Sequence, residues 1–166
     1  VYAADWISHE SPVSDSLKSV WGSSDTDVFA VGDAGKILHY NGINWSEMDS
    51  TLSENLRSVW GVSENDVFAA GYSGTILRYD GAGWSEMDRT VSQKLIGIWG
   101  TSENDMFAVG FSGTIIHYDG EIWTKMKSST SENLWGIWGT SGENVFAVGD
   151  WGTILRYDGS SWSKME

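Results

Sequence analysis

A repeat of 39 residues runs through this chain without an insertion, and it limits what the chain can fold into more than any other feature. Two tryptophan series, one phenylalanine series and one tyrosine series all keep this spacing. The tryptophans are Trp6, Trp45, Trp84, Trp123 and Trp162 in one series, and Trp21, Trp60, Trp99 and Trp138 in the other. Such a repeat predicts a small unit that buries its apolar residues only by stacking on its own copies. We place the units at residues 17–55, 56–94, 95–133 and 134–166, after a linker and a surplus strand in residues 1–16.

Each unit contains four short apolar runs separated by residues that favour turns. In the first unit the runs are residues 17–21, 27–31, 36–40 and 45–48. They are too short for helices and rich in β-branched and aromatic residues, which suit strands. Glycines that permit positive φ surround the turn 32–35, and an Asn-Gly or Asp-Gly pair, the strongest short hairpin signal, joins the last two runs. The pattern predicts a four-stranded antiparallel meander in every unit.

The second run of each unit is apolar at consecutive positions, as in Val28–Val31. An antiparallel strand of this kind must bury both of its faces, and a sheet packed between two copies of itself does so. We therefore predict an all-β fold, a β-propeller built of four 39-residue, four-stranded antiparallel blades. A solenoid is the alternative.

Two stretches carry a resemblance to known repeats. Residues 71–84 (GYSGTILRYDGAGW) and 149–162 resemble the Asp-box (BNR) and kelch-like repeats of β-propellers, and the unit is similar to the W-G-x-S-x-x-D-V-F-A-V-G repeats of exported bacterial proteins. The resemblance covers the chain from about Trp6 to its end and implies a propeller. Tyr-Asp-Gly stands where an Asp-box has Ser-x-Asp-x-Gly, so an Asp-box-like glycosidase is only the third functional hypothesis.

The ends of the chain raise the question of how the ring closes. Residues 5–8 match the last strand of a unit, in register with residues 44–47, so both ends offer the same strand. An open end would expose a whole apolar blade face, more than a monomer tolerates. Three forms of closure remain open: four blades close alone, a homodimer closes the ring, or the blades belong to a longer native chain.

Charge and composition argue against several partners. The formal net charge is −13 with only ten lysines and arginines, which disfavours nucleic acid and anionic membranes as partners. No apolar run approaches the ~18 residues of a membrane span. Val1 and Ala3 would suit the −3 and −1 positions of a signal-peptidase site, which predicts an extracellular or periplasmic protein; an arbitrary start of the chain explains them equally well.

No catalytic constellation stands out, and we predict that the chain is not an enzyme. Metal-ligand spacings are absent, and no pair among the 23 acidic residues is singled out. Two histidines share a repeat position with arginines: the four residues are His39, Arg78, His117 and Arg156. This interchange indicates a structural cation, for which we expect Glu47 or Glu86 as the partner.

The acidic turns between the first and second strands raise the question of calcium. Loops such as Ser63–Asp66 offer two carboxylates and an amide, whereas Ca²⁺ takes six to eight oxygen ligands. The structural alternative is that Asp27, Asp66 and Asp105 bond backbone amides in these turns, a role that Asn144 can fill in the fourth copy. We favour this alternative and predict no cofactor.

Aromatic residues that leave the repeat pattern gather on one edge of the blades. Tyr72, Phe111 and Trp151 lie in the turns between second and third strands, and Trp135 lies where the loop between units enters a first strand. In an up-and-down meander these connections share one edge, which we call the aromatic rim. It comprises residues 32–35, 71–74, 110–113 and 149–152 and the loops between units.

Charged residues occupy the same rim positions in the other units. Asp33 and Asp150 correspond to Tyr72 and Phe111, and Lys18 and Arg57 correspond to Trp135. Aromatic rings beside charged groups bind sugars by stacking, and the same residue types dominate protein hot spots. We predict a binding module that recognises a carbohydrate or a protein on this rim, or else a structural unit of an extracellular assembly; drift at exposed turns is the remaining explanation. The predicted ligand-binding residues are Trp135, Trp151, Phe111, Tyr72, Asp33, Asp150, Lys18 and Arg57.

Overall fold

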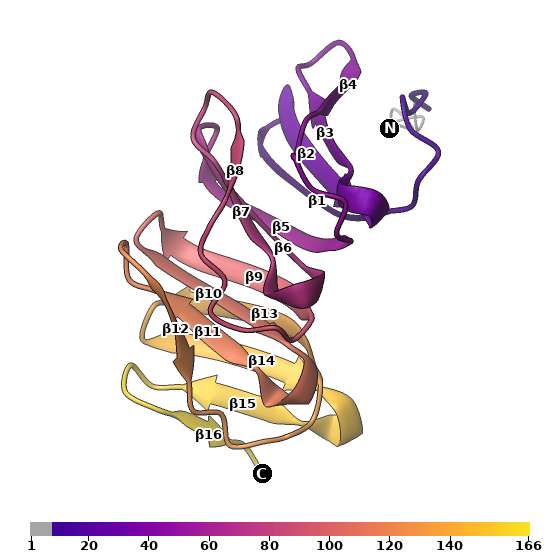
Figure 1. Ribbon diagram of the computed structural model, residues 1–166. Helices are drawn as coiled ribbons and strands as arrows, with labels where there is room; N and C mark the ends of the chain where they lie inside the picture. The colour runs from indigo at the N-terminus through magenta and orange to yellow at the C-terminus, as the bar shows by residue number, and fades with distance from the viewer. Residues whose placement is uncertain (1–7) are drawn as a thin grey trace, which may run out of the picture.

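The computed structural model describes residues 8–166, which form four antiparallel four-stranded sheets (Figure 1). In every sheet the strands lie side by side in chain order. The first blade contains β1 (Leu17–Ser24), β2 (Asp27–Gly32), β3 (Ile37–Tyr40) and β4 (Trp45–Met48), and the second β5 (Leu56–Ser63), β6 (Asp66–Gly71), β7 (Ile76–Tyr79) and β8 (Trp84–Glu86). The third contains β9 (Leu95–Ser102), β10 (Asp105–Gly110), β11 (Ile115–Tyr118) and β12 (Trp123–Met126), and the fourth β13 (Leu134–Ser141), β14 (Asn144–Gly149), β15 (Ile154–Tyr157) and β16 (Trp162–Lys164). The predicted all-β propeller architecture with four such blades is confirmed.

The strand boundaries differ from the predicted ones where local hydrogen bonding decides them. The first strand continues to Ser24 because it pairs with β2 across a register shift between Gly22 and Ser24. The third strand begins at Ile37, since the Lys36 N–H donates to the Asp33 carbonyl and closes a turn instead. That turn is the 3₁₀ turn η1 (Asp33–Gly35); its equivalents are η2 (Tyr72–Gly74), η3 (Phe111–Gly113) and η4 (Asp150–Gly152). Within residues 8–166, no helix has the length and apolar character needed to cross a membrane.

Successive blades pack through two different faces. The leading face points to the next blade; in the first blade it is formed by Trp21, Phe29, Val31, Ile37 and Met48. The trailing face receives the preceding blade; in the second blade it is formed by Leu56, Val59, Val67, Leu77 and Trp84. Phe68 on one face of β6 and Ala69 on the other are both fully buried, as the consecutive apolar pattern predicts.

The Trp-Gly pair of the first strand explains how closely the blades approach at the first and third junctions. The indole of Trp21 lies over Gly61 of the next blade, where an added Cβ would come within 2.4 Å of the ring. Trp99 lies over Gly139 in the same way, with a Cβ distance of 2.6 Å. Any side chain at these glycines would push neighbouring blades apart. The repeat thus packs a bulky tryptophan of one blade onto a flat seat, the glycine of the next blade.

The four blades form an arc, with β1–β4 at one end and β13–β16 at the other (Figure 1). Among residues 8–166, no further blade covers the trailing face of the first blade or the leading face of the fourth. Val20 is 65% exposed, whereas its equivalent Val59 is 3% exposed; Trp138 is 58% exposed, whereas Trp99 is 5% exposed. Of the surplus strand predicted at residues 5–8, residues 5–7 lie outside the described residues.

Candidate binding rim

The aromatic rim is built on four 3₁₀ turns of one shape. The middle residue of each turn has a left-handed conformation, with φ of 54° at Ala34, 58° at Ser73, 55° at Ser112 and 54° at Trp151. A bulky residue such as tryptophan seldom adopts this conformation, which costs about 1–2 kcal/mol for an L-residue. Trp151 therefore adopts the left-handed conformation that its three counterparts share, although tryptophan disfavours a positive φ.

The two glycines around each turn have different roles. The last residue of the turn, such as Gly74 with φ of 71°, needs the positive φ that we predicted for both glycines. The glycine before the turn is extended instead, with φ of −158° at Gly71. Space explains its presence, since a Cβ on Gly71 would lie 2.4 Å from the Asn55 carbonyl oxygen.

Charged groups pack at the end of the rim near the first blade. The Lys18 ammonium lies 3.0 Å from the Asp33 carboxylate, and the Arg57 guanidinium of the next blade lies 3.8 Å from it. Arg57 also lies over the Tyr72 ring, 4.7 Å from its centroid, and donates a hydrogen bond to the Tyr72 hydroxyl. This hydrogen bond, together with the positive charges of Arg57 and Lys94, lowers the pKa of Tyr72.

Lys94 connects the second blade to the third, and sequence reasoning missed it. Its ammonium lies 4.1 Å from the centroid of the Tyr72 ring and 5.4 Å from that of Phe111. Among residues 8–166 it has no carboxylate within salt-bridge distance. Its repeat counterparts are Asn55 and Asn133, whose side chains accept hydrogen bonds from turn N–H groups of the preceding blade, at distances of 2.9 Å and 3.1 Å. The departure of S-Q-K-L from S-E-N-L was the signal that could have identified it.

Aromatic contacts continue the rim to the fourth blade. The Phe111 and Trp135 rings meet edge to face with centroids 5.4 Å apart. The Trp135 indole N–H donates to the Asp150 carboxylate, and Asn133 donates to the other oxygen of that carboxylate at 3.0 Å. Trp135 is nevertheless 48% exposed. The structure therefore holds the Trp135 ring in place and leaves much of it open to a ligand.

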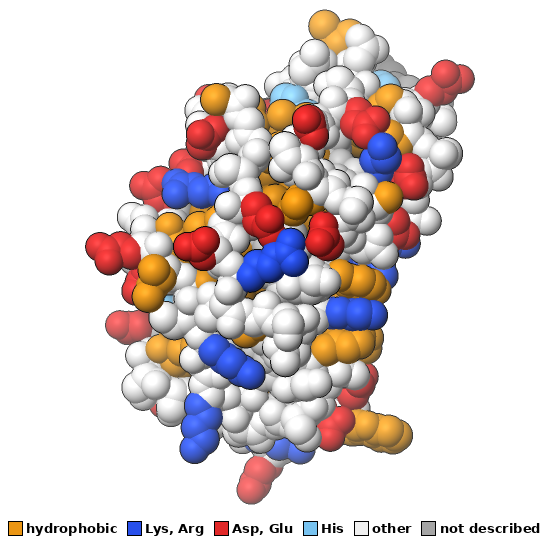
Figure 2. All heavy atoms as spheres, in the orientation of Figure 1, with side chains coloured by type: hydrophobic (Ala, Val, Ile, Leu, Met, Phe, Trp, Pro, Cys, Tyr) orange, Lys and Arg blue, Asp and Glu red, His pale blue; other side chains and the backbone are white. Residues whose placement is uncertain are grey.

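Together these contacts form one row, which we call the rim row. It consists of Lys18, Asp33, Arg57, Tyr72, Lys94, Phe111, Trp135 and Asp150. Figure 2 shows hydrophobic and basic side chains alternating along the right-hand edge of the molecule, the edge on which the 3₁₀ turns lie in Figure 1. Seven of the eight predicted site residues thus lie in one row. The eighth, Trp151, follows Asp150 at its end and is 89% exposed.

The opposite rim, formed by the turns around residues 24–27 and 41–44 and their equivalents, corrects two expectations. Its cations pair with the residue that begins the second strand, so the prediction of Glu47 or Glu86 as partner is wrong. His39 lies 2.6 Å from Asp27, His117 2.8 Å from Asp105, Arg78 2.6 Å from Asp66 and Arg156 3.0 Å from Asn144. Strand register explains this, since Phe29 pairs with His39 and places Asp27 diagonally opposite on the same face.

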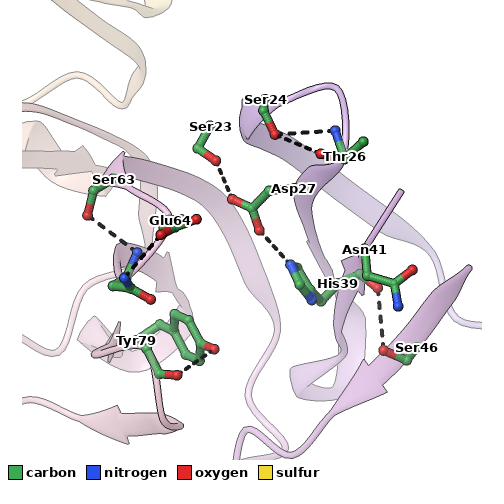
Figure 3. A network of polar contacts seen from close by, with 12 residues as sticks. Ser23, Ser24, Thr26, Asp27, His39, Asn41, Ser46, Ser63, Glu64 and Tyr79 are labelled. Atoms are coloured by element: carbon green, nitrogen blue, oxygen red, sulfur yellow. Dashed lines mark hydrogen bonds and ion pairs between the residues drawn. The ribbon is translucent and has the colours of Figure 1, made fainter. Parts of the chain in front are cut away.

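The acidic turns themselves bond side chains rather than the backbone amides we expected. Asp27 accepts hydrogen bonds from Ser23 as well as His39 (Figure 3), and Asp105 accepts one from Thr101. Glu47 and Glu86 are engaged by Lys36 and Arg89. Within residues 8–166 no group of three or more His, Cys, Asp or Glu side chains could hold a metal ion.

Comparisons with known proteins support the fold. No protein-family model and no curated protein matches the chain. Among solved structures it is similar to YCF48 bound to D1 peptide, with a TM-score of 0.73 and 14% identity over 93% of this chain and 54% of that one. It is also similar to YCF48 from Cyanidioschyzon merolae, with a TM-score of 0.72 and 17% identity over 93% of this chain and 57% of that one.

A third similar structure is the computationally designed Ika4 protein, with a TM-score of 0.75 and 16% identity over 95% of this chain and 99% of that one. The chain thus spans little more than half of the two YCF48 chains and nearly all of the designed chain. At these identities the likeness shows the fold alone, and the fold is that of a β-propeller.

Proposed function

We propose that this chain is a non-enzymatic binding module that holds a segment of a partner protein on the aromatic rim. The observation that carries the proposal is the rim row, in which the Lys94 ammonium, without a carboxylate partner among the described residues, lies over the rings of Tyr72 and Phe111. Tyr, Trp and Arg are the residues most enriched at the energetic centres of protein interfaces, and the rim row contains all three, as Tyr72, Trp135 and Arg57.

Exposure separates these rings from the structural aromatics. Trp151 is 89% exposed and contributes little to the stability of the fold, while its left-handed backbone costs stability. Trp84, which belongs to the repeat pattern, is 7% exposed and packs between blades. An exposed tryptophan in an unfavourable conformation is best explained by a ligand that covers it.

The charges of the rim row favour a particular class of partner. Three cations stand against two carboxylates in the row, although the whole chain has a net charge of −13. We expect a peptide carboxylate near Lys94 and an apolar side chain against Trp151. That one of the similar propellers was solved bound to a peptide supports a protein partner over a carbohydrate.

A random linear peptide library displayed on phage tests the proposal. We expect selection on the 166-residue chain to enrich peptides that combine acidic and aromatic residues. Trp135→Ala or Trp151→Ala should then weaken binding of the selected peptides by about thirtyfold, or ~2 kcal/mol, with little change in melting temperature. Ile122→Ala, on the opposite rim and 60% exposed, is the matched control and should bind normally.

Two results would contradict the proposal. Selected peptides that bind the two tryptophan variants as well as the unaltered chain would place the site elsewhere. A glycan array that gives specific, Trp151-dependent binding while the peptide selection enriches nothing would assign the rim to a carbohydrate instead.

A further inference from the structure

The two open ends of the arc are complementary, and we infer that a second copy of this chain closes the ring. The leading face of the fourth blade would pack on the trailing face of the first blade of the other copy, and the reverse contact would close the ring. The same contact would place Asp150 of one copy beside Lys18 of the other. This inference goes beyond the proposed function and does not rest on it.

The residues exposed at the ends are those buried at every internal junction. On the fourth blade, leading-face residues that are buried or half-buried in the other blades are open to solvent: Trp138, Val148, Ile154 and Met165. On the first blade, Leu17 and Val20 of the trailing face are exposed, whereas their equivalents in the second blade, Leu56 and Val59, are buried. The two faces therefore offer each other the side chains that already form three junctions within the chain.

The first blade also presents a seat for the fourth blade's indole. A cleft of about 420 Å³ lies on its trailing face, where Leu17, Val20, Leu38 and Trp45 line it together with His9 and Ser11 of the N-terminal segment. The three atoms nearest to a Cβ added to Gly22 belong to its own blade, the closest being the Asp27 carbonyl oxygen at 2.9 Å. The corresponding Gly61 and Gly139 are covered by the indoles of Trp21 and Trp99, and Trp138 is the equivalent tryptophan of the fourth blade.

The charged residues at the two ends of the rim are complementary in the same way as the residues at the internal junctions. At the first internal junction Asp33, the leading residue of a 3₁₀ turn, faces Arg57 of the next blade at 3.8 Å. At the third, Phe111 in the equivalent position meets Trp135 at 5.4 Å. Asp150 and Lys18 hold these positions at the two ends, so closure would join an acid to a base and make the rim row continuous around the ring.

A second copy suits both open faces of the 166-residue chain. One identical chain satisfies both open faces at once and gives a closed ring with two equal junctions, the symmetry that most homodimers have. In the described part of the N-terminal segment, His9 meets Tyr40 at 5.5 Å and lines the edge of the cleft together with Ser11, while Leu17 and Val20 remain exposed.

Light scattering after size-exclusion chromatography tests the inference on the 166-residue chain. We expect about twice the 18.3 kDa mass of one chain. Trp138→Asp on the leading face and Val20→Asp on the trailing face should each give the mass of a single chain. Ile122→Asp, equally exposed but outside both faces, should keep the dimer mass, and circular dichroism should show that all three variants are folded.

Mixing the two interface variants shows whether unlike faces meet. A pair made of one Trp138→Asp chain and one Val20→Asp chain retains one unaltered junction, so a dimer should return in the mixture. Variants Asp150→Lys and Lys18→Asp each break the ion pair at both junctions of the ring. Each should therefore weaken the dimer by up to about 25-fold, which is about fivefold for each partly exposed pair, and their mixture should restore it.

The opposite results overturn the inference. A single-chain mass for the unaltered protein would mean that the faces do not associate. A mass above two chains would mean that they associate without closing the ring. A dimer that forms only after residues 1–12 are removed would show that the N-terminal segment occupies the seat, and a dimer that survives Trp138→Asp and Val20→Asp would place its interface elsewhere.

Discussion

The two rims of the arc come from the same repeat but differ in how much they vary between blades. On the opposite rim every blade pairs His or Arg with the Asp or Asn that begins its second strand. On the aromatic rim the equivalent turn position is Asp33, Tyr72, Phe111 or Asp150. A position that the fold requires keeps its chemistry in all four copies, so the variation of the aromatic rim indicates that the fold does not dictate these residues.

The largest expected effect concerns the aromatics that repeat. Trp84→Ala should lower the free energy of unfolding by about 3–5 kcal/mol, because Trp84 is buried against Phe29 of the preceding blade. Trp45→Ala is the matched control, since no blade of the chain covers Trp45. Both variants are made in the Trp138→Asp chain, so that a second copy does not cover Trp45. In urea unfolding, Trp45→Ala should lose less than half of the free energy of unfolding that Trp84→Ala loses. Equal losses would mean that packing between blades does not stabilise this tryptophan.

The sequence predicts the four blades well because every blade repeats the same pattern of apolar and turn residues. Four series of residues at one spacing, with Asn-Gly or Asp-Gly pairs between the last two strands, define four meanders, and β4 has the predicted bounds. Burial on both faces also follows from the consecutive apolar residues of the second strand. Physical constraints that act locally and recur four times leave few alternatives.

Sequence reasoning was less successful where contacts cross between strands or blades. The partner of His39 depends on strand register, which places Asp27 and not Glu47 beside it. Lys94 is a single substitution in a loop, and only the packing of neighbouring blades brings it over two rings. The arc, too, depends on the angle between blades, which no residue pattern specifies.

A smaller effect is expected from restoring the repeat at Lys94. In Lys94→Asn the new side chain can accept a hydrogen bond from the Ser73 N–H, as Asn55 and Asn133 do for the corresponding turns. We expect the free energy of unfolding to rise by up to ~1 kcal/mol. Affinity for the selected peptides should fall, and its dependence on salt should weaken because a cation has been removed.

Lys94→Gln separates the two effects, since glutamine also removes the charge but is longer than the asparagine found in the other copies. It should lose affinity without the gain in stability. If Lys94→Asn bound peptides normally, Lys94 would be part of the scaffold and the contrast between the rims would weaken.

The smallest effect distinguishes two tyrosines by their ionisation. Arg57 lowers the pKa of Tyr72 through its hydrogen bond, whereas burial between blades raises the pKa of Tyr157, with the negative charge of Asp158 adding to it. Phenolate absorption followed as the pH rises should therefore show Tyr72 ionising before Tyr157. The part of the titration lost in Tyr72→Phe should lie at lower pH than the part lost in Tyr157→Phe, and Arg57→Gln should move the ionisation of Tyr72 to higher pH.

The two shifts also affect stability with opposite signs. The folded pKa of Tyr72 is depressed, so its contribution is present above the unfolded pKa and is lost as the pH falls through the folded pKa. The folded pKa of Tyr157 is raised, so its contribution is present below the unfolded pKa and is lost as the pH rises through the folded pKa. In alkaline solution Tyr157→Phe should therefore reduce the loss of stability with rising pH, and Tyr72→Phe should increase it. If Arg57→Gln left the ionisation of Tyr72 unchanged, Arg57 would not hold the Tyr72 hydroxyl, and the rim row would be broken at its second blade.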